Sequence, residues 1–197
     1  MTHRSPSISK IMRAERPVRP VLDALMALNI DLSLDTIAIR LGMWVWTDVA
    51  LNEQWFGVPW ANFWAWFVVV WSYSTLVRAF RPWQTHAIRR WIYVPVAMIL
   101  SLLILLVSSE LYRTMTSIDS RPVASLFLLV GSLLIVLEAH PRMDRSASTQ
   151  RTILIVPLVL HSFALAVGIG SGIFAQQPIL AAISVTMLVS SLLVHLV

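Results

Sequence analysis

Residues 56–67 read FGVPWANFWAWF, and residues 68–77 continue as VVVWSYSTLV. A Gly-Val-Pro turn is followed by three tryptophans, two phenylalanines and one asparagine, and then by a run that is apolar enough to lie in lipid. Pro59 stands where a helix would begin, and a proline costs little there because the first N–H groups of a helix have no partner within it. The stretch therefore predicts a membrane-spanning helix over about residues 58–79 with unusually aromatic first turns.

The composition of the whole chain also indicates an integral membrane protein. Of the 197 residues, 57% are hydrophobic and 13% are charged, and the mean hydropathy is +0.75. A soluble domain has about 25% charged residues. The chain contains no cysteine, which excludes disulfides, thiolate metal sites and cysteine nucleophiles. It also lacks the nucleotide-binding and hydrolase motifs that short patterns can identify.

Five apolar segments predict transmembrane helices. They cover residues 58–79, 91–112, 122–138, 152–175 and 178–197. A sixth segment, residues 21–46, is ambiguous, because it carries ionisable residues that are costly in hydrocarbon, namely Asp23, Asp31, Asp35 and Arg40. The expected fold class is all-α, an integral membrane helical bundle over residues 21–197, with a basic cytoplasmic N-terminal arm over residues 1–20.

The distribution of positive charge favours six transmembrane helices over five. If residues 21–46 do not cross, the 15 Lys and Arg residues divide eight to seven between the two sides. If they do cross, twelve lie on one side and only Arg113 and Arg121 on the other, with Arg40 in the span or near its end. Lys and Arg concentrate in cytoplasmic loops. We therefore expect a multi-pass protein of the cell inner membrane, or of a photosynthetic intracytoplasmic membrane, with both termini in the cytoplasm.

Asp31 and Asp35 are candidate catalytic residues. They are four residues apart and share one face of a helix, whereas Asn29 and Arg40 point roughly the other way. Paired carboxylates within a membrane can transfer protons, bind a cation or act as a general acid. The alternative is that both carboxylates only hydrogen-bond to neighbouring groups, or that the helix lies at the membrane surface. The sequence leaves both interpretations open.

The aromatic residues after the Gly-Val-Pro turn predict a contact surface. All nine tryptophans lie between Trp44 and Trp91, whereas interfacial anchors would be spread over every span. A flat aromatic stripe can contact a long polyene or a porphyrin-like ring. The alternative is interfacial anchoring combined with helix packing. The residues expected to contact a pigment or a partner protein are Trp60, Asn62, Phe63, Trp64, Trp66, Phe67 and Trp71.

Residues 158–170, LVLHSFALAVGIG, contain one further candidate. A neutral imidazole at His161 could ligate the metal of a chlorophyll-type pigment or a haem. The alternative is a histidine that hydrogen-bonds to another helix. Ala164, Gly168 and Gly172 form a small-xxx-small ladder, which predicts close helix packing. No metal-ligating cluster is expected.

The order and spacing of several motifs resemble the carotenoid biosynthesis membrane family, which includes carotenoid 1,2-hydratases of the bisanhydrobacterioruberin hydratase type. Family members show Asp-x-x-x-Asp-Pro, then Gly-x-Trp-x-Trp, then Gly-Val-Pro-x-x-Asn-Phe-x-Gly-Trp. The matching residues here are Asp31, Asp35, Gly42, Trp44, Trp46, Gly57, Val58, Pro59, Asn62, Phe63 and Trp66. Thr36 replaces the usual proline, and Ala65 replaces the glycine before Trp66.

This resemblance implies a carotenoid context, but it covers only about 45 residues and corresponds to the C-terminal half of the family. We therefore expect a non-catalytic membrane subunit that packs against pigments or pigment proteins, with an accessory or stabilising role in a photosynthetic reaction-centre or light-harvesting complex. Its expected partners are membrane lipid and other subunits, without nucleic acid, and its expected ligand is a carotenoid or chlorophyll-type pigment that is not covalently bound. The alternative is a carotenoid hydratase that adds water to acyclic ends, with Asp31 or Asp35 as the acid.

The six-helix topology can be tested by cysteine labelling, because the chain has no cysteine of its own. Cysteines introduced at Ser7 and at Asn52 should react with membrane-impermeant reagents from opposite sides of the membrane. Labelling of both positions from one side would remove the first crossing and leave five.

Overall fold

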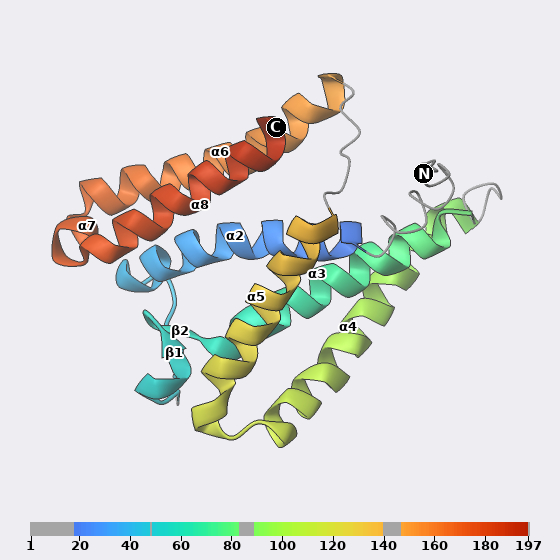
Figure 1. The fold of residues 1–197 in the computed structure, drawn as a ribbon, viewed down its shortest axis with the longest axis horizontal. Coiled ribbons are helices and arrows are strands. Elements are labelled where there is room, and N and C mark those ends of the chain that lie inside the picture. The colour runs from blue at the N-terminus through green and yellow to red at the C-terminus, as the bar shows by residue number, and fades with distance from the viewer. Residues whose placement is uncertain (1–17, 48, 83–88, 140–146, 197) are drawn as a thin grey trace, which may run out of the picture. The chain divides into compact units, whose positions relative to one another are not determined.

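The computed structural model describes residues 18–47, 49–82, 89–139 and 147–196 (Figure 1). These residues are almost entirely helical, which confirms the all-α prediction. The long helices are α2 (Val18–Arg40), α3 (Trp60–Phe80), α4 (Arg89–Met115), α5 (Arg121–Ala139), α6 (Ala147–Gly170) and α8 (Pro178–Leu196). The short elements are η1 (Leu51–Glu53), β1 (Gln54–Trp55), β2 (Val58–Pro59), η3 (Ile118–Ser120) and α7 (Ile173–Gln176). Residues 1–17 of the expected N-terminal arm lie outside the described residues.

Proline and glycine residues determine several helix ends. Pro178 is the first residue of α8, and Pro59 directly precedes α3. Helix α2 ends at Arg40, earlier than the expected residue 46, because Gly42 adopts a left-handed backbone with φ of 71°. The Gly42 N–H donates to the Ile39 carbonyl, and the Met43 N–H donates to the Ala38 carbonyl. This is the hydrogen-bond pattern of a Schellman C-cap, and it stops the helix.

A second expected helix also ends earlier than the sequence indicated. Helix α6 ends at Gly170, not at residue 175, because Gly172 has a φ of 74° and turns the chain into α7. Gly172 therefore lies outside α6. The ladder that the sequence predicted has only Ala164 and Gly168 on the helix, and its third member forms a turn.

Three helices of the described chain are long and apolar enough to cross a membrane. They comprise residues Trp60–Phe80, Trp91–Met115 and Ile118–Ala139. The apolar segments Leu154–Gly170 and Pro178–Val194 are shorter. Helix α2 is long, but Asp23, Asp31 and Asp35 lower its hydropathy. Crossing by α2, α6 and α8 therefore stays a prediction.

The described chain divides into two compact units. The first unit contains residues 18–25, 64–82, 89–115 and 126–139. Within it, the Trp64 ring of α3 stacks on the Tyr112 ring of α4, with centroids 4.7 Å apart. Asp23 accepts hydrogen bonds from Ser74 and Arg78 of α3. These contacts join α3 to α4 and to the first turns of α2.

The second unit contains residues 26–47, 49–63, 116–125 and 147–196. Helices α6 and α8 lie side by side and are joined by α7 (Figure 1). A buried cluster of Ile37, Ala164, Ile173 and Leu180 joins α2 to all three of these helices. The segment before α3 contacts the segment at the start of α5, where Glu53 forms an ion pair with Arg121 at 2.5 Å and Asn52 donates to Asp119 at 2.9 Å.

The turn between α6 and α7 provides a stability test. A Cβ atom added at Gly168 would clash with the Phe174 ring, so Gly168→Ala should destabilise the protein by about 1–3 kcal/mol through overpacking. Gly131 of α5 has no such neighbour within 4 Å, and Gly131→Ala should be neutral or stabilising by up to about 1 kcal/mol. The measurement is the thermal midpoint in detergent. Adding Phe174→Leu should restore the thermal midpoint of the Gly168→Ala variant. Equal thermal midpoints for Gly168→Ala and Gly131→Ala would contradict the packing argument.

Candidate functional site

The part of α2 that belongs to the second unit has two polar faces. Successive residues of a helix are rotated by about 100°, so residues four apart share a face and residues two apart lie on nearly opposite faces. Asp31 and Asp35 form one face, and Asn29 and Ser33 form the other. The contacts described below follow this division, as the sequence predicted for Asp31, Asp35 and Asn29.

Asp31 and Asp35 meet at one side-chain amide. The Asn62 Nδ2 atom donates to Asp31 Oδ2 at 3.0 Å and to Asp35 Oδ2 at 3.2 Å. Both aspartates are buried, and Asn62 lies in the first turn of α3. The amide group has two hydrogens, one for each carboxylate. The structure therefore brings together three of the residues that the sequence singled out.

The Gly-Val-Pro turn places Asn62 beside α2. Strands β1 and β2 form a short antiparallel hairpin in which Gln54 pairs with Pro59, and α3 starts directly after it. Gly57 has a φ of 92°, and a Cβ atom there would lie 3.2 Å from the Ile39 side chain. A larger residue at position 57 would be strained and would also push the hairpin away from α2. The close approach of this turn to α2 brings Asn62 within reach of the two carboxylates.

Arg40 fixes the other end of the same turn. Its Nη1 atom donates to the carbonyls of Thr36 and Phe56, each at 2.8 Å, and its Nη2 atom donates to Gln177 Oε1. The guanidinium also lies over the Phe56 ring, 5.8 Å from its centroid. One side chain thus joins α2 to the hairpin and to the start of α8. Sequence reasoning placed Arg40 near the end of a span but gave no partner for it.

His161 forms hydrogen bonds through both ring nitrogens. Nδ1 lies 3.0 Å from Ser33 Oγ, and Nε2 lies 2.8 Å from Asn29 Oδ1. The Asn29 Nδ2 atom in turn donates to Met187 Sδ at 3.3 Å. The side chain is only 1% exposed. The structure thus shows the alternative interpretation, a histidine that hydrogen-bonds to another helix, and leaves neither nitrogen open for a pigment metal.

The aromatic residues of α3 do not form one exposed surface. Trp60, Phe63 and Phe67 are buried inside the chain, and Trp60 packs against the rings of Trp55 and Phe63. Two of the predicted contact residues are exposed on the surface of the chain: Trp66 is 45% exposed and Trp71 is 39% exposed. The buried rings therefore stabilise the fold. Pigment or partner contact stays a prediction for the exposed ones.

Comparison with known protein families assigns the chain to a family. The sequence profile described as "carotenoid biosynthesis protein" matches residues 3–132. The chain belongs to this family. Searches among curated proteins and among solved structures gave no significant match.

The family match covers more of the chain than the motifs that resemble the family. It contains Asp31, Asp35 and Asn62 together with helices α2 to α4 and part of α5. His161, Met187 and the start of α8 lie beyond it. In this member of the carotenoid biosynthesis family, the carboxylate pair thus belongs to the matched region, while α2 packs through its other face against helices outside that region.

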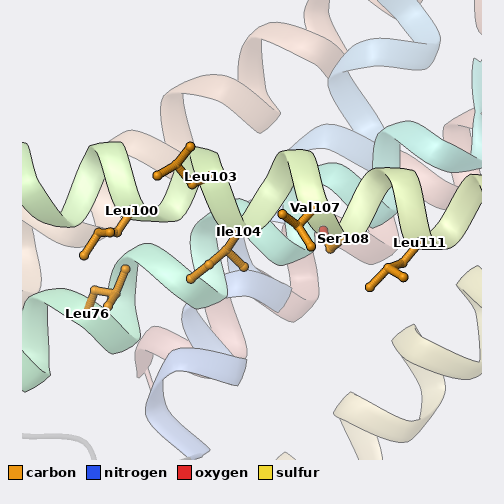
Figure 2. A pocket seen from close by; sticks show the side chains of 7 residues that line it. All are labelled: Leu76, Leu100, Leu103, Ile104, Val107, Ser108 and Leu111. Carbon is orange, nitrogen blue, oxygen red and sulfur yellow. The ribbon is translucent and has the colours of Figure 1, made fainter.

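The first unit has an apolar groove of about 490 Å³ between α3 and α4. Figure 2 shows its lining, in which Leu76 of α3 faces a row of α4 side chains. These are Leu100, Leu103, Ile104, Val107, Ser108 and Leu111. The groove suits an alkyl or polyene chain. No group of three or more His, Cys, Asp or Glu side chains that could hold a metal ion occurs among the described residues.

The shared amide can be tested by a double-mutant cycle. Asn62→Leu leaves two buried carboxylates without their common donor, and we expect a loss of about 1–3 kcal/mol of stability. In an Asp31→Asn background, the new amide can donate to Asp35, so Asn62→Leu should cost less. The measurement is chemical or thermal unfolding in detergent. An equal cost in both backgrounds would show that Asn62 acts independently of the pair.

Proposed function

We propose that this protein is a membrane enzyme of carotenoid biosynthesis that adds water to a terminal double bond of an acyclic carotenoid. One observation carries the proposal: Asp31 and Asp35 are buried together on the Asn62 amide within the region that matches the family. The match to residues 3–132 is longer than the resemblance over about 45 residues on which the expectation of a non-catalytic subunit was based, and it includes the whole carboxylate pair with its amide.

The reaction needs an acid, a base and protection of a cation. A carboxyl group of the pair donates its proton to the less substituted alkene carbon, and positive charge develops on the tertiary carbon. Water then forms a C–O bond to that carbon, and its excess proton passes to a carboxylate of the pair. The net change is addition of one water, and the pair ends in its starting state. General acid and base groups contribute about 10²–10⁴-fold each to such a reaction.

The environment of the pair supports this chemistry. Burial keeps bulk water away from a reactive cation, and the two carboxylates supply negative charge next to it. Asn62 holds both groups in fixed positions through neutral hydrogen bonds.

We propose that α2 crosses the membrane together with α6 and α8. Asn29 contacts Met187 and Arg40 contacts Gln177, so α2 runs antiparallel to α8 over these residues. Eleven residues of helix correspond to about 16 Å, roughly half of the hydrocarbon core. A helix that lies along two apolar helices over this length shares their depth. This supports six crossings, and the distribution of Lys and Arg supports cytoplasmic termini in the cell inner membrane.

A second candidate is the accessory subunit of a pigment complex. It is favoured by the exposed apolar surface of α4 and α5, where Val107 is 62% exposed and Phe127 is 80% exposed. Such a surface fits partner helices and pigments as well as lipid. Gentle purification of the native protein, followed by absorption spectroscopy and identification of the chains that co-purify, distinguishes a stoichiometric pigment complex from a free enzyme.

The hydratase proposal predicts a specific product and a loss of that product when either aspartate is replaced. Expression in a host that makes lycopene should give carotenoids with tertiary hydroxyl groups, detected by chromatography and mass spectrometry. Asp31→Asn and Asp35→Asn should each lower the yield at least about 100-fold, because each removes one partner in proton transfer.

Asp23→Asn is the matched control for this experiment. Asp23 lies on the same helix but pairs with Arg78 and Ser74 in the first unit, so its replacement should leave most of the activity. Absence of hydroxylated product from well-expressed wild-type protein, or equal loss in all three variants, would contradict the proposal.

A further inference from the structure

The interaction of His161 with α2 extends the candidate site beyond the matched region. His161 lies on α6 and reaches two residues of α2 that are one turn apart, Ser33 at 3.0 Å and Asn29 at 2.8 Å. Met187 of α8 contacts Asn29 from the second helix of the pair. His161 and Ser33 are each only 1% exposed.

The hydrogen-bond pattern defines the orientation of each group. Because Asn29 Nδ2 faces the Met187 sulfur, its Oδ1 atom faces the histidine ring. An amide oxygen can only accept, so His161 Nε2 carries the hydrogen and Nδ1 accepts from the Ser33 hydroxyl. Every polar atom of the imidazole is thereby used. Both hydrogen bonds can form only when α2 has one particular rotation about its helix axis.

We propose that His161 is a positioning residue for the Asp31–Asp35 pair. Asn29, Asp31, Ser33 and Asp35 alternate along α2, so the contacts that hold Asn29 and Ser33 against α6 also direct both carboxylates to Asn62. If α2 turned by one residue, about 100°, the carboxylates would leave the amide. The effect on catalysis rests on the proposed hydratase function. The effect on helix orientation does not.

A cross-linking measurement tests the orientation directly. The chain has no cysteine, so Asp35→Cys with Asn62→Cys gives one defined pair, whose bridging by a short thiol reagent can be quantified by mass spectrometry. His161→Leu should lower the cross-linked fraction several-fold. His161→Gln keeps one donor and one acceptor and should retain most of it. Asn52→Cys with Asp119→Cys, on loops that meet away from His161, should cross-link equally in all backgrounds.

The control pair also reports on folding. If His161→Leu lowers both cross-links, the variant is misfolded, and Ser33→Ala then replaces it. Ser33→Ala removes the partner of Nδ1, together with a longer contact of Ser33 Oγ to the Ile30 carbonyl of its own helix at 3.3 Å, and should reduce the Asp35–Asn62 cross-link about twofold or more. Ser72→Ala is its matched control, since Ser72 is equally buried but donates only to Val69 of its own helix. If the cross-link is unchanged in Ser33→Ala or in folded His161→Leu, the proposal is overturned.

The activity measurement separates this proposal from the proposed function. For a positioning residue, His161→Leu should lower kcat by about 10–100-fold with little change in KM, and His161→Gln should restore much of it. Equal losses in the leucine and glutamine variants would overturn the positioning role. If the cross-link depends on His161 but Asp31→Asn and Asp35→Asn leave conversion intact, the orientation holds and the hydratase function fails.

Discussion

Helix α2 must give every polar group that it buries a partner, and the arrangement around it follows from this requirement. A buried charged group without a partner costs several kcal/mol, and apolar surroundings raise that cost. Asp31 and Asp35 share the Asn62 amide, and Arg40 uses two backbone carbonyls and Gln177. Apart from the Thr36 carbonyl of α2 itself, these partners lie within residues 56–62 and at Gln177, so α2 organises the second unit around itself.

This requirement explains the spacing of the family motifs in physical terms. The aspartates are four residues apart because both must face one amide, and the asparagine follows Gly-Val-Pro because that turn starts α3 beside α2. Gly57 is needed at the turn for its positive φ and for its contact with Ile39. The two aspartates, the asparagine and Gly57 thus each have a structural reason. The same geometry places two carboxylates close together, so the packing role and the proposed catalytic role do not exclude each other.

The sequence predicted most helices because long apolar runs and prolines mark them directly. It missed the ends of α2 and α6, since Gly42 and Gly172 each adopt a left-handed backbone that no periodicity reveals. It identified Asp31, Asp35 and Asn62, but it could not show that they are in contact. Asn62 is separated along the chain from Asp31 by 31 positions and from Asp35 by 27 positions. It also assigned the tryptophans of α3 to one surface. Helical spacing shows which residues share a face, but not whether that face is buried.

The position of His161 limits what the matched region can do by itself. The carboxylates and their amide lie within residues 3–132, but the opposite face of α2 is held by α6 and α8, which lie beyond them. Apolar packing alone allows a helix to rotate slightly about its axis, whereas hydrogen bonds fix its orientation because they are directional. A helix with ionisable residues on one face therefore needs a hydrogen-bonding neighbour on the opposite face. In this chain the neighbour is the imidazole. The orientation of the acidic groups therefore depends on a side chain that lies outside the matched residues.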